Sequence, residues 1–252
     1  MIFIFGTIIG SFLNVVIFRY NTNFSFGGRS MCLYCGKILK WYELVPLLSF
    51  LVLKGRCATC KSRLSFQYPA VEFMAGLLFL LSFMYAKNYM VDVIFYFLPY
   101  LLAVMSILLV TVVYDIRHKI IPDGLVFFFI LLSLARPIVF PLPGEDLVFS
   151  LLSGPVFALP FVAIFFFSRG KWIGLGDAKL VLGIGWFLGM VGAGLALLAS
   201  FWIGAIVSII LLLLKNRKFT MGSEIPFAPF LVLGFAIALF IPTSYLMQIL
   251  GF

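Results

Sequence analysis

Charged residues are scarce in this sequence. Asp, Glu, Lys and Arg make up 11% of its 252 residues, hydrophobic residues make up 64%, and the mean hydropathy is +1.20. Ordinary soluble domains carry about 25% charged residues, so this composition excludes a soluble globular protein. The sequence therefore predicts an all-α polytopic membrane protein whose surroundings are the lipid bilayer.

Acidic residues are scarcer still, with nine Asp and Glu against 18 Lys and Arg, and the formal net charge is +9. In a soluble protein this excess would indicate a nucleic-acid partner. In a membrane protein, Lys and Arg accumulate in cytoplasmic loops. We therefore predict that the charge reflects topology and that the protein binds no nucleic acid.

The N-terminal apolar run lacks the features of a cleaved signal peptide, since neither a basic segment nor a small-residue cleavage site flanks it. We expect it to remain as a first transmembrane helix. A span needs about 20 apolar residues. Windows that meet or approach this length number eight: 1–18, 70–86, 93–114, 124–140, 147–168, 178–194, 195–214 and 226–248.

The loops between these windows divide the basic residues unequally. All Lys and Arg except Lys87 and Arg136 fall on one face. This bias predicts that the basic face is cytoplasmic and that both termini lie outside. The outer loops are short and carry Asp92, Glu145 and Asp146, which leaves no room there for a further domain.

Cysteine is also rare, and its four copies form two short motifs, CLYC and CATC, with 21 residues between them. This spacing fits a tetrathiolate zinc site. A pair of disulfides is the alternative, but thiols stay reduced in the cytoplasm. The predicted Zn²⁺ ligands are Cys32, Cys35, Cys57 and Cys60.

The cysteines lie in the one sizeable soluble region, residues 19–69. A region of about 50 residues cannot build a strong hydrophobic core without a disulfide or a structural metal. Zinc would therefore supply much of its folding free energy. We predict three parts in chain order: a first transmembrane helix at 1–18, a cytoplasmic zinc-binding domain at 19–69, and a transmembrane domain at 70–252.

Between the cysteine motifs, WYELVPLLSFLVLKG is an apolar run that Pro46 interrupts and that is too short to span a membrane. One interpretation places it in the membrane interface, with Trp41 and Tyr42 at the level of the headgroups. In the other interpretation the run forms the core of the zinc domain. The sequence leaves both open.

Two carboxylates are the strongest functional candidates. Asp115 follows the third apolar window, and Asp177 opens the sixth directly after a GLG turn. An ionisable residue at the centre of a membrane helix costs about 2.5 to 3.5 kcal/mol, so each is a candidate for function. Both are expected at one depth near the cytoplasmic surface, where a carboxylate pair could activate water for peptide hydrolysis. The alternative is that each only caps its helix.

Neighbouring residues receive simpler interpretations. Gly174 and Gly176 would let the backbone approach a substrate strand closely. We interpret Asp123 as the N-cap of the fourth helix, His118, the only histidine, as an exposed loop residue, and Lys179 as a side chain that reaches the interface.

The remaining candidate acids also have structural interpretations. Glu72 and Glu224 lie near cytoplasmic helix ends, where they would cap a helix or meet the basic loops. Glu43 belongs to the zinc domain. None of these three is predicted as a site residue.

Several segments together resemble the type IV prepilin peptidase family, the bacterial branch of the GxGD intramembrane aspartyl proteases. The two cysteine motifs, preceded by GRS and GR, are part of this set. The other segments are GSFLNVVIFR at 10–19, WYELVPLLSF at 41–50, YPAVE at 68–72, YDIRHKIIPD at 114–123 and GLGDAKL at 174–180. The resemblance runs from end to end and implies that Asp115 and Asp177 are the catalytic pair.

The resemblance also implies a substrate class. Family members cleave the short basic leader of type IV prepilins or pseudopilins, usually after a Gly, at the cytoplasmic boundary of the bacterial inner membrane. They serve type IV pilus and type II secretion systems. The expected partners of this chain are therefore prepilin or pseudopilin substrates.

Many family members then methylate the new N-terminal amine with S-adenosylmethionine, an activity associated with the zinc-binding region. The sequence has no glycine-rich strand-turn-helix unit of the ordinary nucleotide-binding kind, so a site for this cofactor must be built differently. Glu43 and Glu72 are conceivable contacts, but salt bridges explain them equally well. One departure from the family is PFAP at 226–229 in place of PFGP, where Ala228 lacks the freedom of glycine.

Two other classes of function stay open. A transporter or channel also uses acids and helix-breaking Gly and Pro, but here the acids lie near one surface and no inverted repeat is evident. A pilus or secretion scaffold would use the zinc domain to dock partners. Substitution of either aspartate discriminates the three, because a protease loses cleavage, a transporter loses flux and a scaffold loses neither.

Overall fold

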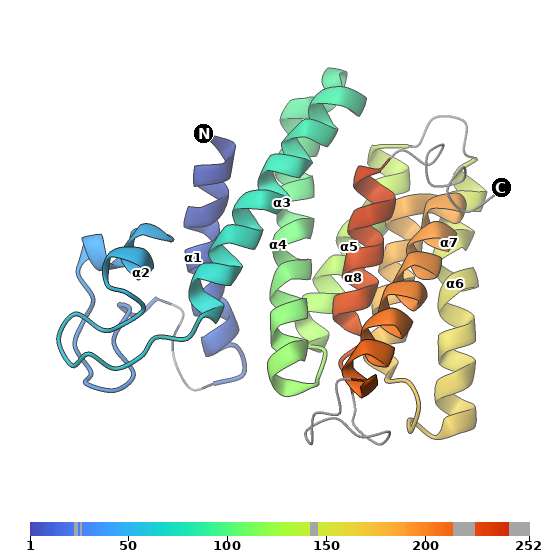
Figure 1. The fold of residues 1–252 in the computed structure, drawn as a ribbon. Helices are drawn as coiled ribbons and strands as arrows, with labels where there is room; N and C mark the ends of the chain where they lie inside the picture. The colour runs from blue at the N-terminus through green and yellow to red at the C-terminus, as the bar shows by residue number, and fades with distance from the viewer. Residues whose placement is uncertain (23–24, 26, 142–145, 214–224, 242–252) are drawn as a thin grey trace. The chain divides into compact units, whose positions relative to one another are not determined.

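The computed structural model describes residues 1–22, 25, 27–141, 146–213 and 225–241. These residues form helices, turns and two isolated β-bridges (Figure 1). The all-helical class predicted from the sequence is confirmed for the part of the chain that the structure describes.

Five of the described helices are long and apolar enough to cross a membrane. They are α1 (Ile2–Arg19), α3 (Gln67–Tyr89), α4 (Ile94–His118) preceded by the 3-10 turn η2 (Val91–Val93), α6 (Leu147–Ser168) and α7 (Leu175–Leu213). Two other apolar helices are shorter, α5 (Asp123–Val139) and α8 (Ala228–Phe240). Five such helices are found instead of the eight predicted windows. Helices α5 and α8 have 17 and 13 described residues, which is too short for a full span, and two of the predicted windows lie together in α7.

Some predictions fall on parts of the chain that the structure does not describe. The end of the last predicted window and two of the acids are among them, as are three basic residues. These are residues 242–248, Glu145, Glu224, Lys215, Arg217 and Lys218, all of which lie outside the described residues.

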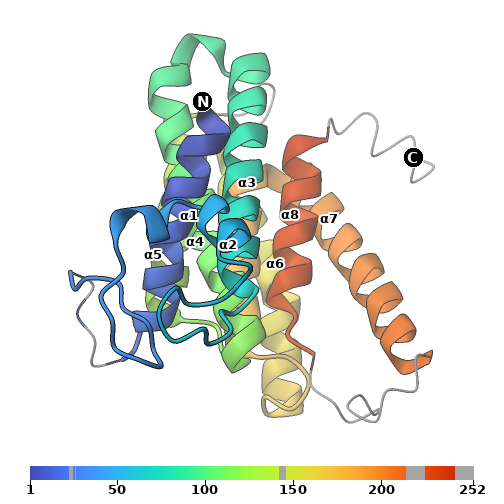
Figure 2. The ribbon, with the colours of Figure 1, turned by 60° about the vertical axis from the view of Figure 1, so that its left-hand side comes forward.

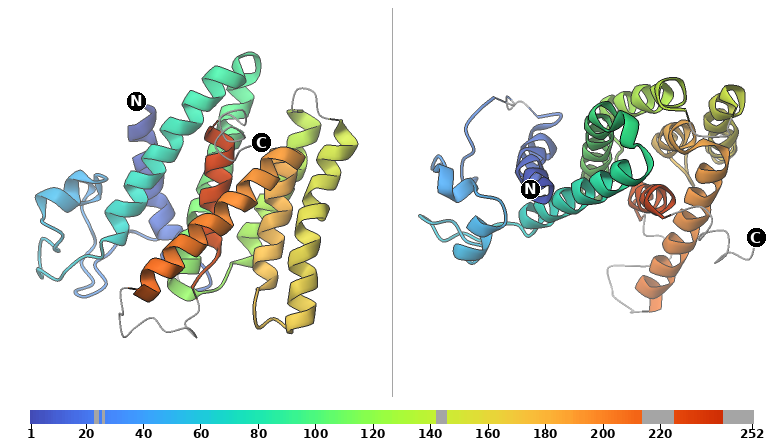
Figure 3. Two further views of the ribbon diagram at one scale, coloured as in Figure 1. Left: turned by 45° about the vertical axis from the view of Figure 1, so that its right-hand side comes forward. Right: turned by 90° about the horizontal axis from the view of Figure 1, so that it is seen from above.

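Helix α7 consists of two helical segments that meet at Gly189. The backbone there has φ 73° and ψ −176°, a conformation essentially reserved for glycine. The chain reverses direction at this point, so that the second segment runs back at a steep angle to the first (Figure 3). The windows predicted at 178–194 and 195–214 are therefore both helical as far as the described residues extend, to residue 213, but their boundary lies at Gly189 rather than after residue 194.

The chain forms two compact units, residues 1–110 and 111–252. In the first unit, α1 packs against α3 (Figure 2). A Cβ atom at Gly10 would lie 2.8 Å from Cα of Glu72, so the small residue permits a close helix contact. Nearby, the amide of Asn14 donates to the carbonyl of Tyr68 at 3.1 Å. These contacts join the GSFLN and YPAVE segments.

The linker between α1 and α3 contains the cysteine motifs, the 3-10 turn η1 (Trp41–Leu44) and the short helix α2 (Leu48–Val52). The guanidinium of Arg19 donates to the carbonyls of Gly28 and Arg29 at 3.1 and 3.3 Å. This interaction attaches the start of the linker to the end of α1.

In the second unit, α5, α6 and α8 pack against α7. Phe235 of α8 meets Phe129 of α5 and Phe187 of α7, with ring centroids 6.2 and 5.1 Å apart. The guanidinium of Arg136, one of the two basic residues outside the predicted basic face, is buried and lies over the Phe187 ring. The first segment of α7 is thereby fixed between α5 and α8.

Candidate active site and metal centre

Asp115 and Asp177 belong to the second unit and come from two different helices. Asp115 lies in the last turn of α4 and is only 4% exposed, while Asp177 lies in the first turn of α7 and is half-buried. Their carboxylates are close enough to interact electrostatically. The structure therefore brings the two predicted residues together.

Helix α8 completes the surroundings of Asp115. The backbone N–H of Ala228 hydrogen-bonds its carboxylate. The Oδ2 atom of Asp115 is buried and has no hydrogen-bond partner among the described residues. Ala228 is the first residue of α8, so alanine in the PFAP segment adopts helical backbone geometry and keeps the N–H that contacts Asp115.

Asp177 also stabilises the start of its own helix. Its Oδ2 atom accepts the backbone N–H of Gly174 at 3.3 Å, and its own N–H donates to the Gly174 carbonyl at 3.2 Å. This is half of a capping box. Capping and proximity to Asp115 therefore coexist, because the cap occupies one of the two carboxylate oxygens.

The two glycines before Asp177 have different roles. A Cβ atom at Gly176 would lie 2.8 Å from Cβ of Ile121, which belongs to the connection between α4 and α5. A Cβ atom at Gly174 would make only an ordinary contact of 3.6 Å with Asp177. Gly176 thus permits the connection to pack closely on the start of α7.

The interpretation of Asp123 as an N-cap is wrong. Pro122 occupies the cap position, Asp123 is the first helical residue, and its side chain makes no cap hydrogen bond. Instead, Oδ1 of Asp123 lies 2.7 Å from Nζ of Lys179. Lys179 therefore forms an ion pair that links α5 to α7. His118 is exposed, as expected, at the end of α4, where its ring lies 4.5 Å from that of Tyr114.

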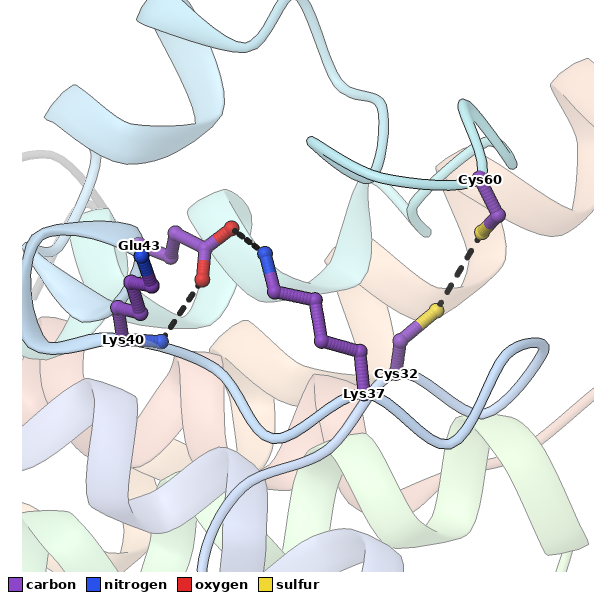
Figure 4. A network of polar contacts seen from close by, with 5 residues as sticks. All are labelled: Cys32, Lys37, Lys40, Glu43 and Cys60. Carbon is purple, nitrogen blue, oxygen red and sulfur yellow. Dashed lines mark hydrogen bonds and ion pairs between the residues drawn. The ribbon is translucent and has the colours of Figure 1, made fainter.

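The four cysteines converge in the first unit. All four are free thiols, and their Sγ atoms lie within 4.8 Å of one another, with 3.8 Å between Cys32 and Cys60 (Figure 4). Sulfur ligands around a tetrahedral ion with 2.3 Å bonds lie about 3.8 Å apart. The cluster therefore fits a tetrathiolate metal site rather than the alternative pair of disulfides.

The two cysteine motifs adopt the same local structure. The N–H of Cys32 donates to the Lys37 carbonyl, and the N–H of Cys57 donates to the Ser62 carbonyl, both at 2.9 Å. The fifth residue of each turn has a left-handed backbone, with φ 69° at Gly36 and φ 57° at Lys61. The shared geometry was not predicted, although the equal spacing of the motifs is a signal that could have indicated it.

Backbone hydrogen bonds favour the thiolate form of Cys32. Backbone N–H groups of Cys35 and Tyr34 lower the pKa of the Cys32 thiol to about 6, and the thiolate is the form that binds a metal. Ser62 Oγ lies 3.1 Å from the sulfur of Cys60. It is placed to hold that ligand from outside the cluster.

Glu43 ties the first turn to η1. Its Oε1 atom lies 2.9 Å from Nζ of Lys37, and its Oε2 atom accepts the N–H of Lys40 at 2.7 Å (Figure 4). The Lys40 N–H and the Lys37 ammonium lower the pKa of the Glu43 carboxyl. The salt-bridge interpretation of Glu43 is therefore supported.

Glu72 does not cap its helix or pair with a basic loop, the two roles that the sequence suggested, but accepts a hydrogen bond from the backbone of the linker. It is buried in α3, and its Oε2 atom accepts the backbone N–H of Leu47 at 2.8 Å. Leu47 has an unusual backbone, with φ 60° and ψ −48°. The carboxylate thus fixes a turn of the linker instead of capping α3 or pairing with a basic loop.

Comparisons with known proteins cover the residues of both the cysteine cluster and the aspartate pair. The Bacterial Peptidase A24 N-terminal domain model matches residues 4–86, and the Type IV leader peptidase family model matches residues 102–209. A prepilin leader peptidase/N-methyltransferase of Bacillus subtilis (strain 168) is 31% identical over 242 residues, which cover 94% of this chain and 92% of the relative. The chain belongs to the type IV leader peptidase family.

Two further relatives are also named prepilin leader peptidase/N-methyltransferase. That of Pseudomonas putida is 30% identical and covers 99% of this chain and 93% of the relative. That of Myxococcus xanthus (strain DK1622) is 36% identical over 86% of this chain and 64% of the relative. No solved structure matches the chain significantly. The resemblance found from the sequence motifs is confirmed.

Proposed function

We propose that this type IV leader peptidase family member is a membrane-embedded prepilin peptidase. It cleaves the basic leader from type IV prepilins or pseudopilins and methylates the new N-terminus. The observation that carries the proposal is the pairing of Asp115 and Asp177 beside the start of α8. The names of the relatives support the substrate class and the second activity.

In the proposed mechanism the two aspartates divide the acid and base roles. Close carboxylates favour the state that holds a single proton between them. The ionised member takes a proton from water, whose oxygen attacks the carbonyl carbon of the scissile bond. The protonated member donates its proton to the carbonyl oxygen. The tetrahedral intermediate then collapses and the C–N bond breaks. The aspartate that took the proton from water gives it to the leaving amine, and the other aspartate recovers its proton from a hydroxyl of the intermediate, so that the starting protonation of the pair is restored.

The oxygen atoms of the two aspartates differ in their hydrogen-bond partners. One carboxylate oxygen of Asp177 accepts a hydrogen bond from the Gly174 N–H. Asp115 has a buried oxygen, Oδ2, without a hydrogen-bond partner among the described residues. A buried carboxylate oxygen normally has a hydrogen-bond partner. We assign that position to the water that both carboxylates share.

The zinc-binding segment and the membrane orientation belong to the same proposal. Cys32, Cys35, Cys57 and Cys60 would hold a structural Zn²⁺ ion that stabilises the linker. The basic face would be the cytoplasmic face of the inner membrane, where the leader stays while the apolar helix of the substrate remains in the bilayer. S-adenosylmethionine would supply the methyl group, but no described residue is assigned to bind it.

A cleavage assay with purified protein in liposomes tests the proposal. The substrate is a prepilin with a basic leader, Gly at the junction and an apolar N-terminus. We expect Asp115→Asn and Asp177→Asn each to abolish cleavage. Asp123→Asn, the matched control at the same end of the helices, should fold and still cleave, at a rate lowered about ten-fold by loss of its ion pair with Lys179. Thermal unfolding of each variant in detergent separates lost catalysis from lost folding.

Two outcomes would reject the peptidase assignment. One is absence of cleavage by the wild-type protein, and the other is normal cleavage by both aspartate variants. An ion-flux assay in the same liposomes then tests the transporter. Mass spectrometry of the cleaved product with added S-adenosylmethionine tests methylation separately, because only that activity adds a methyl group to the new amine.

A further inference from the structure

The segment between the cysteine motifs exposes large apolar side chains. We call residues 41–53, which comprise η1, α2 and their connections, the interfacial segment. Trp41 is 80% exposed, Leu51 is 70% exposed and Val52 is 77% exposed, and no residue of α2 is buried. The segment is therefore not the core of the zinc domain, which was one of the two interpretations left open by the sequence.

The segment is fastened beside a membrane-spanning helix. The hydrogen bond between the Leu47 N–H and Glu72 is 2.8 Å long. Glu72 lies five residues after the start of α3 at Gln67, which is about 7.5 Å along the helix axis. Helix α3 is long and apolar enough to cross a membrane. Within the first unit, α2 lies alongside α1 and α3 rather than beyond their ends (Figures 1 and 2).

The turn that makes this attachment is strained. Leu47 has φ 60° and the N–H of Leu48 donates to the Pro46 carbonyl at 2.6 Å, which is the geometry of a tight γ-turn. A non-glycine residue in such a conformation persists only where its surroundings enforce it. The buried carboxylate of Glu72 supplies that constraint and thereby holds α2 at a defined depth.

Basic side chains adjoin the apolar ones. A shallow hollow of about 520 Å³ is lined by Val52, Leu53, Lys54, Arg56, Cys57 and Lys61. Its three cations lie next to the exposed end of α2, and the one acid of the segment, Glu43, is already paired with Lys37. Apolar side chains with Trp and a basic border are typical of elements that lie in the interface of an anionic membrane.

We infer that the interfacial segment is embedded in the headgroup layer of the bilayer. Trp41, Leu51 and Val52 enter the boundary of the acyl chains, and Lys54 and Arg56 face the phosphates of anionic lipids. The partner is therefore the lipid surface itself. The bound segment holds the cysteine motifs on the aqueous side of the headgroup layer, independently of the aspartate chemistry in the second unit.

Site-specific fluorescence quenching tests this inference. The full-length protein would carry a fluorescent amino acid at Val52, or at Tyr34 as the control, because these two side chains are 77% and 78% exposed. Each protein is reconstituted in nanodiscs that contain anionic lipid. We expect spin-labelled lipid to quench position 52 several-fold more strongly than position 34, and aqueous iodide to show the opposite preference.

Three results would overturn the inference. The first is equal quenching at the two positions, which would remove the distinction between the segment and the cysteine motif. The second is stronger quenching of position 52 by iodide. The third is protection of position 52 from both quenchers, which would indicate that another protein surface covers it.

The role of the basic residues has its own test. In nanodiscs of zwitterionic lipid, lipid quenching at position 52 should fall, and Lys54→Gln with Arg56→Gln should reduce the difference between the two lipid compositions. The expected effect on the equilibrium constant between the bound and the unbound segment is about five-fold for each cation removed. Lys119→Gln, which lies in the second unit, serves as the control. Equal quenching of the wild-type protein in both lipids would contradict the assignment of anionic headgroups.

Discussion

Lys179 and Asp123 form an ion pair, with Nζ 2.7 Å from Oδ1, that joins the N-terminal ends of α7 and α5. Lys179 lies two residues after Asp177, and Asp123 follows the short connection that leads from the end of α4, where Asp115 lies, to α5. The pair therefore spans the two segments that carry the proposed catalytic aspartates. Both side chains are partly or largely exposed, so the pair contributes about 1 kcal/mol or less to stability.

We predict that loss of this pair reduces cleavage more than stability. Lys179→Gln should lower kcat about ten-fold, because a small displacement of a catalytic group is costly, while KM and the thermal midpoint change little. The swapped pair Asp123→Lys with Lys179→Asp should recover part of the rate. Lys171→Gln is the control on an exposed lysine. A change in KM alone would contradict the positioning role.

The two glycines of the GLGD segment should differ in tolerance. Gly176→Ala would place a Cβ atom 2.8 Å from Ile121, so the connection before α5 must shift, and we expect at least a ten-fold loss of cleavage. Gly174→Ala makes an ordinary contact and should retain most activity. Ile121→Gly should partly rescue Gly176→Ala. Equal losses for the two alanine variants would show that close packing is not the reason for glycine.

The equivalent turns of the cysteine motifs should respond in opposite ways. Gly36→Ala places a side chain at φ 69° in otherwise open space, so it should cost about 1 kcal/mol of linker stability through backbone strain alone. Lys61→Gly relieves the same strain at φ 57° and should be neutral or stabilising. The midpoint of zinc loss during titration with a chelator measures both. A destabilising Lys61→Gly would contradict the argument.

Acid should weaken the linker through Glu43. Because its folded-state pKa is lowered, the unfolded state takes up a proton first as the pH falls. The contribution of Glu43 is fully present above the ordinary value of about 4.3 and is lost as the pH falls through the lower folded value. We expect the difference in protease resistance between wild type and Glu43→Gln to be constant near neutral pH and to vanish in acid. A difference that grows in acid would have the wrong sign.

Removal of the metal should unfold the linker. Zinc binding by comparable peptides releases about 10 to 16 kcal/mol, and this energy drives folding. Cys60→Ser should lose bound zinc, measured by elemental analysis, and should expose Lys54 and Arg56 to trypsin. Ser62→Ala keeps all four ligands and should weaken binding about 10- to 100-fold. Retention of zinc and of trypsin resistance by Cys60→Ser would reject the tetrathiolate site.

Much of the candidate site was predictable from the sequence because its signals are local. The apolar windows indicate membrane helices through composition alone. The cysteine motifs indicate a metal site through ligand spacing. Asp115 and Asp177 stand out because acids are rare near apolar helices. Each of these signals depends on residue type and short-range spacing, which the printed sequence contains in full.

Other features depend on contacts between distant segments. The partner of Lys179 is 56 residues away in the chain, and that of Leu47 is 25 residues away. No propensity rule distinguishes Asp123 as an N-cap from Asp123 as an ion-pair partner, because both fit a helix start. The sequence also predicted the boundary between the two segments of α7 at the wrong residue. Several glycines fall in that apolar run, and only packing selects Gly189.

The sequence by itself determined that this protein is helical and membrane-embedded, that it carries a cysteine cluster, and that two aspartates are its candidate chemistry. Only the tertiary structure decided which side chains meet: Asp115 with Asp177, Asp123 with Lys179, and Glu72 with the turn at Leu47. The physical reason is that apolar burial is non-directional, so hydropathy specifies which segments are buried but not the register in which their few polar groups pair.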